Sequence, residues 1–113
     1  MTSLEDSLGN YIVSRATGLL GDFRMPVCAR IITREGIERG WLLKLTNDDI
    51  RRILRRYKEH VAFWNINSKK VSDELALFYN ALDSLGIRSY TWDFFLKLYD
   101  SVPAKRAKPN EKA

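Results

Sequence analysis

Residues 46–64 read TNDDIRRILRRYKEHVAFW, and this stretch decides the fold. Its apolar residues recur every three or four positions, which places them on one face of a helix turning about 100° per residue. They are Ile50, Ile53, Leu54, Tyr57 and Val61. Thr46 is the expected N-cap, and Asp48 and Asp49 follow where acids complement the positive end of the helix dipole. We therefore predict an amphipathic helix that begins at residue 47 and buries one face.

The basic residues of the same helix form two ridges beside the apolar face. Arg51, Arg55 and Lys58 fall on one flank, and Arg52 and Arg56 fall on the far side. Like charges one turn apart cost a few tenths of a kcal/mol each, so a solvated face is the alternative to a phosphate-binding surface. A compact ligand is expected to touch one ridge only. We favour the Arg52/Arg56 ridge for a triphosphate, because two guanidiniums one turn apart make a bidentate clamp.

Apolar residues keep a helical spacing through most of the chain. Besides the arginine helix, the predicted helices cover residues 4–17, 26–34, 68–85 and 92–100. The predicted fold is all-α: a compact bundle of about five helices over residues 1–103, followed by a disordered basic tail over residues 104–113.

Capping residues and helix breakers set the expected boundaries. Ser3, Ser68 and Thr91 are the predicted N-caps, and Pro26 suits the first position of a helix. The segment REGIERG, residues 34–40, contains two glycines and is predicted to be a loop.

Composition narrows the classes of function. The 113 residues hold one cysteine and one histidine, Cys28 and His60. A disulfide within the chain and a histidine-based metal cluster are therefore excluded, and no phosphate-binding glycine loop is present. No run of about 20 apolar residues marks a membrane span, and the start of the chain does not resemble a signal peptide. We expect a cytoplasmic protein with no catalytic residue and no metal site.

Positive charge is concentrated in the middle of the chain. Residues 24–70 carry twelve Lys or Arg and five Asp or Glu, a net charge of +7, whereas the whole chain carries +5. A merely soluble surface more often mixes the two signs. This distribution favours an anionic partner such as nucleic acid.

Aromatic residues lie among these basic residues, the combination in which rings stack on bases and cations hold phosphates. The nucleotide-binding candidates besides the basic ridges are Trp64, Lys69 and Lys70. The DNA-binding candidates are Arg30, Arg34, Trp41, Lys44, Arg88, Tyr90 and Trp92. The alternative is that the tryptophans belong to the core, as most do in a small bundle.

The order of these segments resembles a known family. A short helix ends at Arg34-Glu35-Gly36, the LTNDDIRRILRRY helix follows after a loop, and FWN precedes a long helix that ends in LDSLG. This order resembles the small helical accessory domain that follows the catalytic core in primase-polymerases of archaeal plasmids and viruses. That domain is in turn similar to the C-terminal region of the large primase subunit. The resemblance covers most of residues 3–103 and carries no diagnostic motif.

The resemblance implies a non-catalytic module that binds the initiating nucleotide through its triphosphate and helps to read a single-stranded DNA template. ATP or another nucleotide triphosphate, with or without Mg, would be the ligand, and the catalytic primase-polymerase domain of the same or another chain would be the partner. The chain lacks the cysteines of the iron–sulfur cluster found in the large subunit. Two alternatives remain open: a helix-turn-helix-like regulator of duplex DNA, and a protein-interaction adaptor.

Overall fold

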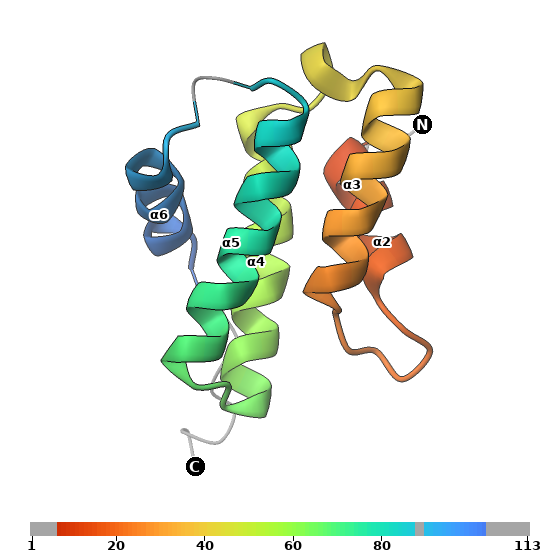
Figure 1. Cartoon of the computed structure of the whole chain (residues 1–113). Helices are drawn as coiled ribbons and strands as arrows, with labels where there is room; N and C mark the ends of the chain where they lie inside the picture. The colour runs from red at the N-terminus through yellow and green to blue at the C-terminus, as the bar shows by residue number, and fades with distance from the viewer. Residues whose placement is uncertain (1–6, 88–89, 104–113) are drawn as a thin grey trace.

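The computed structural model describes residues 7–87 and 90–103 of the chain and shows them as an α-helical bundle (Figure 1). Within these residues there are five α-helices and one short 3-10 helix, and no strand, which confirms the predicted fold class. The elements are α2 (Leu8–Ala16), α3 (Met25–Arg39), η1 (Trp41–Leu43), α4 (Asn47–Trp64), α5 (Ser68–Ser84) and α6 (Trp92–Ser101).

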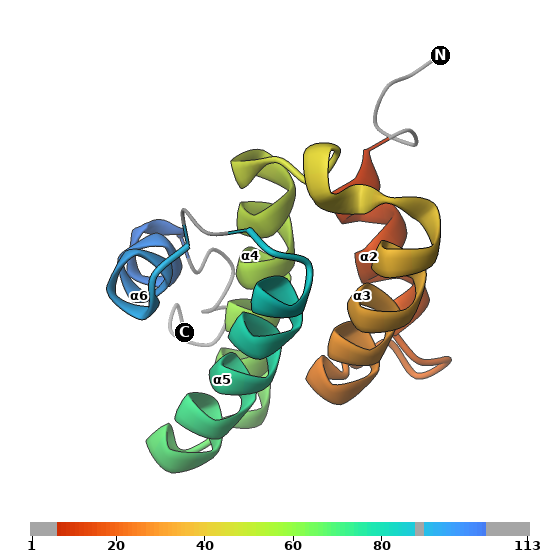
Figure 2. The same ribbon diagram turned by 45° about the horizontal axis from the view of Figure 1, so that its top comes forward.

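Helix α4 occupies the middle of the bundle. It packs against α2 on one side and against α6 on the other, while α3 packs against α2 and α5. Figures 1 and 2 show α2 and α3 as a pair on one side of α4 and α5, with α6 on the opposite side. The basic stretch of the sequence therefore lies on a helix with neighbours on two sides.

The apolar face predicted for the arginine helix is the face that α4 buries. Ile50, Ile53, Leu54 and Tyr57 have no solvent exposure, whereas Val61, near the end of the helix, is half-buried. Burying each of these large side chains contributes roughly 1.5–3 kcal/mol of transfer free energy. The Tyr57 hydroxyl also donates a hydrogen bond to Glu74 Oε1 at 2.9 Å, which links α4 to α5.

The start of α4 is joined to α2 through Asp49. Thr46 is the N-cap, as predicted, and accepts a hydrogen bond from the Asp49 N–H. In return, Asp49 Oδ2 accepts from the Thr46 N–H, and Asp49 Oδ1 accepts from the Gly9 N–H at 2.9 Å and the Ser7 hydroxyl at 3.1 Å. Asp49 is therefore a buried link between two helices as well as a partner of the helix dipole.

The prediction that residues 34–40 form a loop is wrong. Helix α3 continues to Arg39, well beyond the predicted end at residue 34. Gly36 is buried within this helix, where an added Cβ would lie 3.0 Å from Leu85 Cδ2. Gly40 ends the helix in the left-handed conformation, with φ of 66°. One glycine permits close packing and the other stops the helix, so the pair does not mark a loop.

Three of the predicted helix starts also differ from the structure. Helix α3 begins at Met25, so Pro26 is its second residue and not its first. Asn67 caps α5 by accepting from the Lys70 N–H at 2.9 Å, so Ser68 is the first helical residue and not the cap. Ser7 caps α2, and the expected cap Ser3 lies outside the described residues, as does the tail over residues 104–113. Thr91 caps α6 as predicted.

Candidate anion-binding cleft on helix α4

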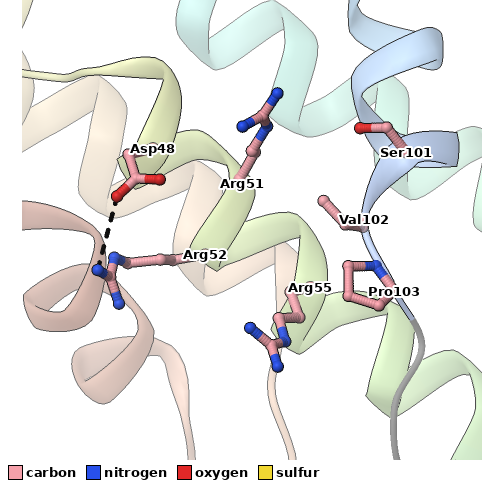
Figure 3. Close-up of a pocket in the computed structure, with 7 residues that line it drawn as sticks. All are labelled: Asp48, Arg51, Arg52, Arg55, Ser101, Val102 and Pro103. Atoms are coloured by element: carbon pink, nitrogen blue, oxygen red, sulfur yellow. Dashed lines mark ion pairs between the residues drawn. The ribbon is translucent and has the colours of Figure 1, made fainter.

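A cleft of about 400 Å³ opens between the first half of α4 and the end of α6 (Figure 3). It is lined by Asp48, Arg51, Arg52, Arg55, Ser101, Val102 and Pro103. The charged side chains all come from α4, and the last three residues form the opposite wall (Figure 3). The cleft therefore brings three of the predicted arginines to one hollow.

Two of these arginines are free to bind a ligand. Arg51 and Arg55 are exposed, and neither makes a hydrogen bond or an ion pair with any residue in the described parts of the chain. Arg52 is half-buried and forms an ion pair with Asp48, with Nη2 and Oδ2 at 3.6 Å. A guanidinium without a protein partner offers all five of its N–H donors to an anion.

The structure corrects the grouping of the arginines into two separate ridges. Arg52 lines the same cleft as Arg51 and Arg55, although its position in the sequence predicts that it lies with Arg56 on the far side of the helix. Residues three apart are neighbours on a helix surface, so Arg52 and Arg55 are close despite belonging to different ridges. One compact ligand at the cleft therefore faces residues of both predicted ridges.

Lys58 positions the wall of the cleft. Its Nζ donates to the backbone carbonyls of Tyr99 and Val102, both at 3.0 Å, and lies 4.8 Å from the centre of the Tyr99 ring. These carbonyls belong to the last turn of α6 and the residue after it, where the dipole favours a cation. Lys58 thus holds the end of α6 beside α4 and is not among the residues that line the cleft.

Arg56 also serves the fold. Its guanidinium donates to the Gly21 carbonyl and lies 5.9 Å from the centre of the Phe23 ring. Both partners belong to the connection between α2 and α3. The predicted Arg52/Arg56 clamp is therefore not assembled, since Arg56 donates to Gly21 in this connection while Arg52 pairs with Asp48 at the edge of the cleft.

Trp64 lies at the other end of α4. It lies nine positions after Arg55, about 13.5 Å along the helix axis. Its side chain is 55% exposed and contacts Phe63, which is 77% exposed, in an edge-to-face arrangement. Lys69 and Lys70 follow at the start of α5, where they form ion pairs with Asp73 at 3.2 Å and Glu74 at 3.8 Å. These candidates form a second basic and aromatic locality, separate from the cleft.

Burial changes the role expected of the other aromatic candidates. Trp41 is 3% exposed and Tyr90 is 6% exposed, so neither ring offers a face to a base. Trp41 packs edge-on against Tyr11, and the Tyr90 hydroxyl donates to Asn47 Oδ1. Trp92 is half-buried against Tyr79 and Phe95. The expectation that Trp41 and Tyr90 stack on DNA is corrected: both are core residues.

The remaining basic candidates are dispersed. Arg30 and Arg34 are exposed on α3, and Lys44 is exposed after η1. Lys44 lines a second hollow of about 480 Å³, which also includes Ser7, Asp48 and Arg52. Arg88 lies outside the described residues. The Asp48–Arg52 ion pair therefore borders both hollows.

The lone cysteine and the lone histidine both lie away from the cleft. Cys28 is fully buried, and burial raises the pKa of its thiol well above the ordinary range, which disfavours the reactive thiolate. Burial lowers the pKa of His60, whose Nδ1 is buried with no hydrogen-bond partner in the described structure. Across residues 7–87 and 90–103, no three His, Cys, Asp or Glu side chains gather where they would hold a metal ion.

None of the described helices combines the length and the apolar character needed to cross a membrane.

Sequence reasoning missed the wall of the cleft. Residues 101–103 follow the predicted helix over residues 92–100 and carry no binding signal, and the sequence indicates for Asp48 only a role beside the helix dipole. More than 40 positions separate Asp48 from the wall, and no local pattern reports which helix end approaches α4. Only Pro103, which ends the helix, gave a local signal.

Comparison with protein-family models, with curated proteins and with solved structures gives no match for this chain.

Proposed function

We propose that this chain is a non-catalytic helical domain of the primase-polymerase type, which binds a nucleotide triphosphate in the cleft of α4 and single-stranded DNA on the basic surface around it. One observation carries the proposal: Arg51 and Arg55 line one cleft beside Arg52 and have no hydrogen-bond or ion-pair partner within the described residues. Three guanidiniums around one hollow suit a ligand with several phosphate groups, because guanidiniums bind phosphate oxygens bidentately.

The size of the cleft agrees with a small ligand. Its volume of about 400 Å³ lies within the range of small-molecule sites, roughly 300–1,000 Å³. The surrounding charge supports an anion, since residues 24–70 carry twelve basic and five acidic side chains. Such a field raises the local concentration of a polyanion and speeds its association.

The position of α4 favours a nucleotide or a flexible strand over duplex DNA. A recognition helix enters the major groove with an exposed face, and base readout needs side chains that reach base edges. Here the arginines line a cleft whose other wall is the end of α6, so this side of α4 is not an open helix face. A single strand can bend into this hollow, and the exposed rings of Phe63 and Trp64 offer stacking faces further along α4.

Catalysis is assigned to a primase-polymerase domain on the same or another chain, and the proposed setting is the cytoplasm. The charged groups of the cleft are three guanidiniums and one carboxylate, and its one hydroxyl, Ser101, donates to the Leu98 carbonyl and not to a base. The domain's contribution is therefore positioning of the nucleotide and the template.

The test is a two-dimensional NMR titration of the full chain with ATP, a single-stranded oligonucleotide and a duplex. We expect shifts at Arg51, Arg52 and Arg55 with ATP, and wider shifts with the single strand. Preference for the duplex would instead support a DNA-binding regulator, and no response to any of the three would leave a protein-interaction adaptor.

A pair of matched variants tests the site itself. Arg51→Ala/Arg55→Ala should cost roughly 1–3 kcal/mol of ATP affinity, the range for hydrogen bonds to charged groups. Arg24→Ala/Lys97→Ala removes the same charge from two exposed positions that do not line the cleft. Equal losses in the two variants would show that net charge alone attracts ATP, and would refute the cleft as the site.

A further inference from the structure

Asp48 is the one carboxylate among the residues that line the arginine cleft. The helix start does not require it, because Thr46 and Asp49 form the capping box and Asp49 alone makes the contacts to α2. The Asp48 side chain is 72% exposed, and within the described structure its hydrogen-bonding and ionic contacts amount to the ion pair with Arg52. An acid in this position opposes the binding of any bare anion.

The ion pair also sets the direction of Arg52. Figure 3 shows its side chain extended toward Asp48 and away from Val102 and Pro103, while Arg51 and Arg55 project elsewhere around the hollow. Both partners are substantially exposed, and the atoms are 3.6 Å apart. Pairs of this kind contribute little to stability, so a ligand can separate them at small cost.

A magnesium ion gives both partners a role in the bound state. Mg²⁺ prefers oxygen ligands, retains several waters, and is commonly held by one or two carboxylates together with the phosphates of a substrate. Since no cluster of metal-ligating side chains lies in the described part of the chain, phosphate oxygens and waters would supply the other ligands. A carboxylate beside three guanidiniums therefore matches the mixed charge of a magnesium–polyphosphate complex better than that of a bare polyphosphate.

We propose that Asp48 makes the cleft selective for the magnesium complex of a nucleotide polyphosphate. On binding, the Asp48 carboxylate exchanges Arg52 for the magnesium ion or one of its waters, and Arg52 turns to the phosphates beside Arg51 and Arg55. This inference rests on the proposed function of the cleft and names the form of nucleotide that it takes.

The experiment measures ATP affinity by isothermal titration calorimetry at constant ionic strength, with excess MgCl₂ and with EDTA. The wild-type chain should bind ATP more tightly with magnesium. In Asp48→Asn the ratio of the EDTA dissociation constant to the magnesium dissociation constant should fall by about fivefold, the scale of one exposed ionic contact. Asp48→Glu should retain the magnesium preference.

Asp73→Asn is the matched control. It breaks another exposed i,i+4 ion pair, Lys69–Asp73 at 3.2 Å on α5, and should leave the ratio unchanged. The same ratio in Asp48→Asn and wild type, whether the variant's affinities are unchanged or rise equally in both conditions, would overturn the role of Asp48 while leaving the nucleotide site standing. No ATP binding by the wild type in either condition would overturn both proposals.

Discussion

Asp48 and Asp49 are adjacent acids of the same helix turn, and replacing each with alanine should have very different effects on stability. Asp49→Ala removes an acceptor from the Gly9 N–H, which is buried and would be left unpaired at a cost of about 1–3 kcal/mol. It also removes the reciprocal bond of the capping box, from the Thr46 N–H to Asp49 Oδ2, which contributes about 0.5–1.5 kcal/mol; the bond from the residue-49 N–H to Thr46 remains. The expected loss is therefore about 2–4 kcal/mol. Asp48→Ala removes one exposed ion pair and should cost less than about 1 kcal/mol.

Urea denaturation followed by far-UV circular dichroism measures both values, with the free energy of unfolding taken by linear extrapolation. A small domain has a total stability of about 5–15 kcal/mol, so the Asp49 variant should show a much lower midpoint. Asp49→Asn is the shape-matched control: it keeps one oxygen acceptor and should lose less than the alanine variant. Equal and small losses in Asp48→Ala and Asp49→Ala would refute the argument that Asp49 joins α2 to α4.

Three further predictions follow from the structure and the proposed function. Gly9→Ala should lower the free energy of unfolding by about 1–3 kcal/mol, the range for overpacking, because the added Cβ would lie 2.8 Å from the backbone oxygen of Asp49. Gly18→Ala is the control, because its added Cβ would meet no atom closer than 3.4 Å. Equal melting temperatures of the two variants would contradict the overpacking at Gly9. Burial lowers the pKa of His60 below its ordinary value of 6.5, so the unfolded chain binds the proton more readily and stability should fall as the pH drops below about 6.5. His60→Gln should reduce this loss between neutral pH and pH of about 5.5, and an identical pH profile in urea denaturation would rule out the contribution of His60. Affinity for single-stranded DNA should fall as salt rises, because contacts to phosphate release counterions, and a level affinity in fluorescence anisotropy between low and physiological salt would count against the basic surface.

The proposed site also depends on residues that do not line the cleft. Lys58 donates to carbonyls in the last turn of α6 and at the wall residue Val102. These two contacts hold the wall beside α4 and so set the width of the cleft. Arg56 holds the connection between α2 and α3 at Gly21. Substitution of either basic residue therefore affects the fold as well as the local charge, so Arg51 and Arg55 are the cleaner positions at which to test binding.

The all-α fold, the buried face of α4 and the caps at Thr46 and Thr91 were all predictable from the sequence, because periodicity and capping are properties of neighbouring residues. Gly36 shows where this local reasoning fails. A glycine in a short polar segment predicts a break, yet here it lies within α3 because Leu85, almost 50 residues later, packs against it.

The residues that form the cleft could likewise be predicted only in part from neighbouring residues in the sequence. The spacing of the arginines along α4 was readable, but which of them remain free was decided by their tertiary neighbours. Arg56 donates to the Gly21 carbonyl, and Lys58 donates to carbonyls at the end of α6. Arg51 and Arg55 have no hydrogen-bond or ion-pair partner in the described structure. Trp41 and Tyr90 show the same limit of the sequence. An aromatic residue beside basic residues gives the same sequence pattern whether its ring is buried or exposed, and in the structure both rings are buried. A linear pattern records which side chains are present, whereas burial and pairing depend on segments that meet only after the helices pack.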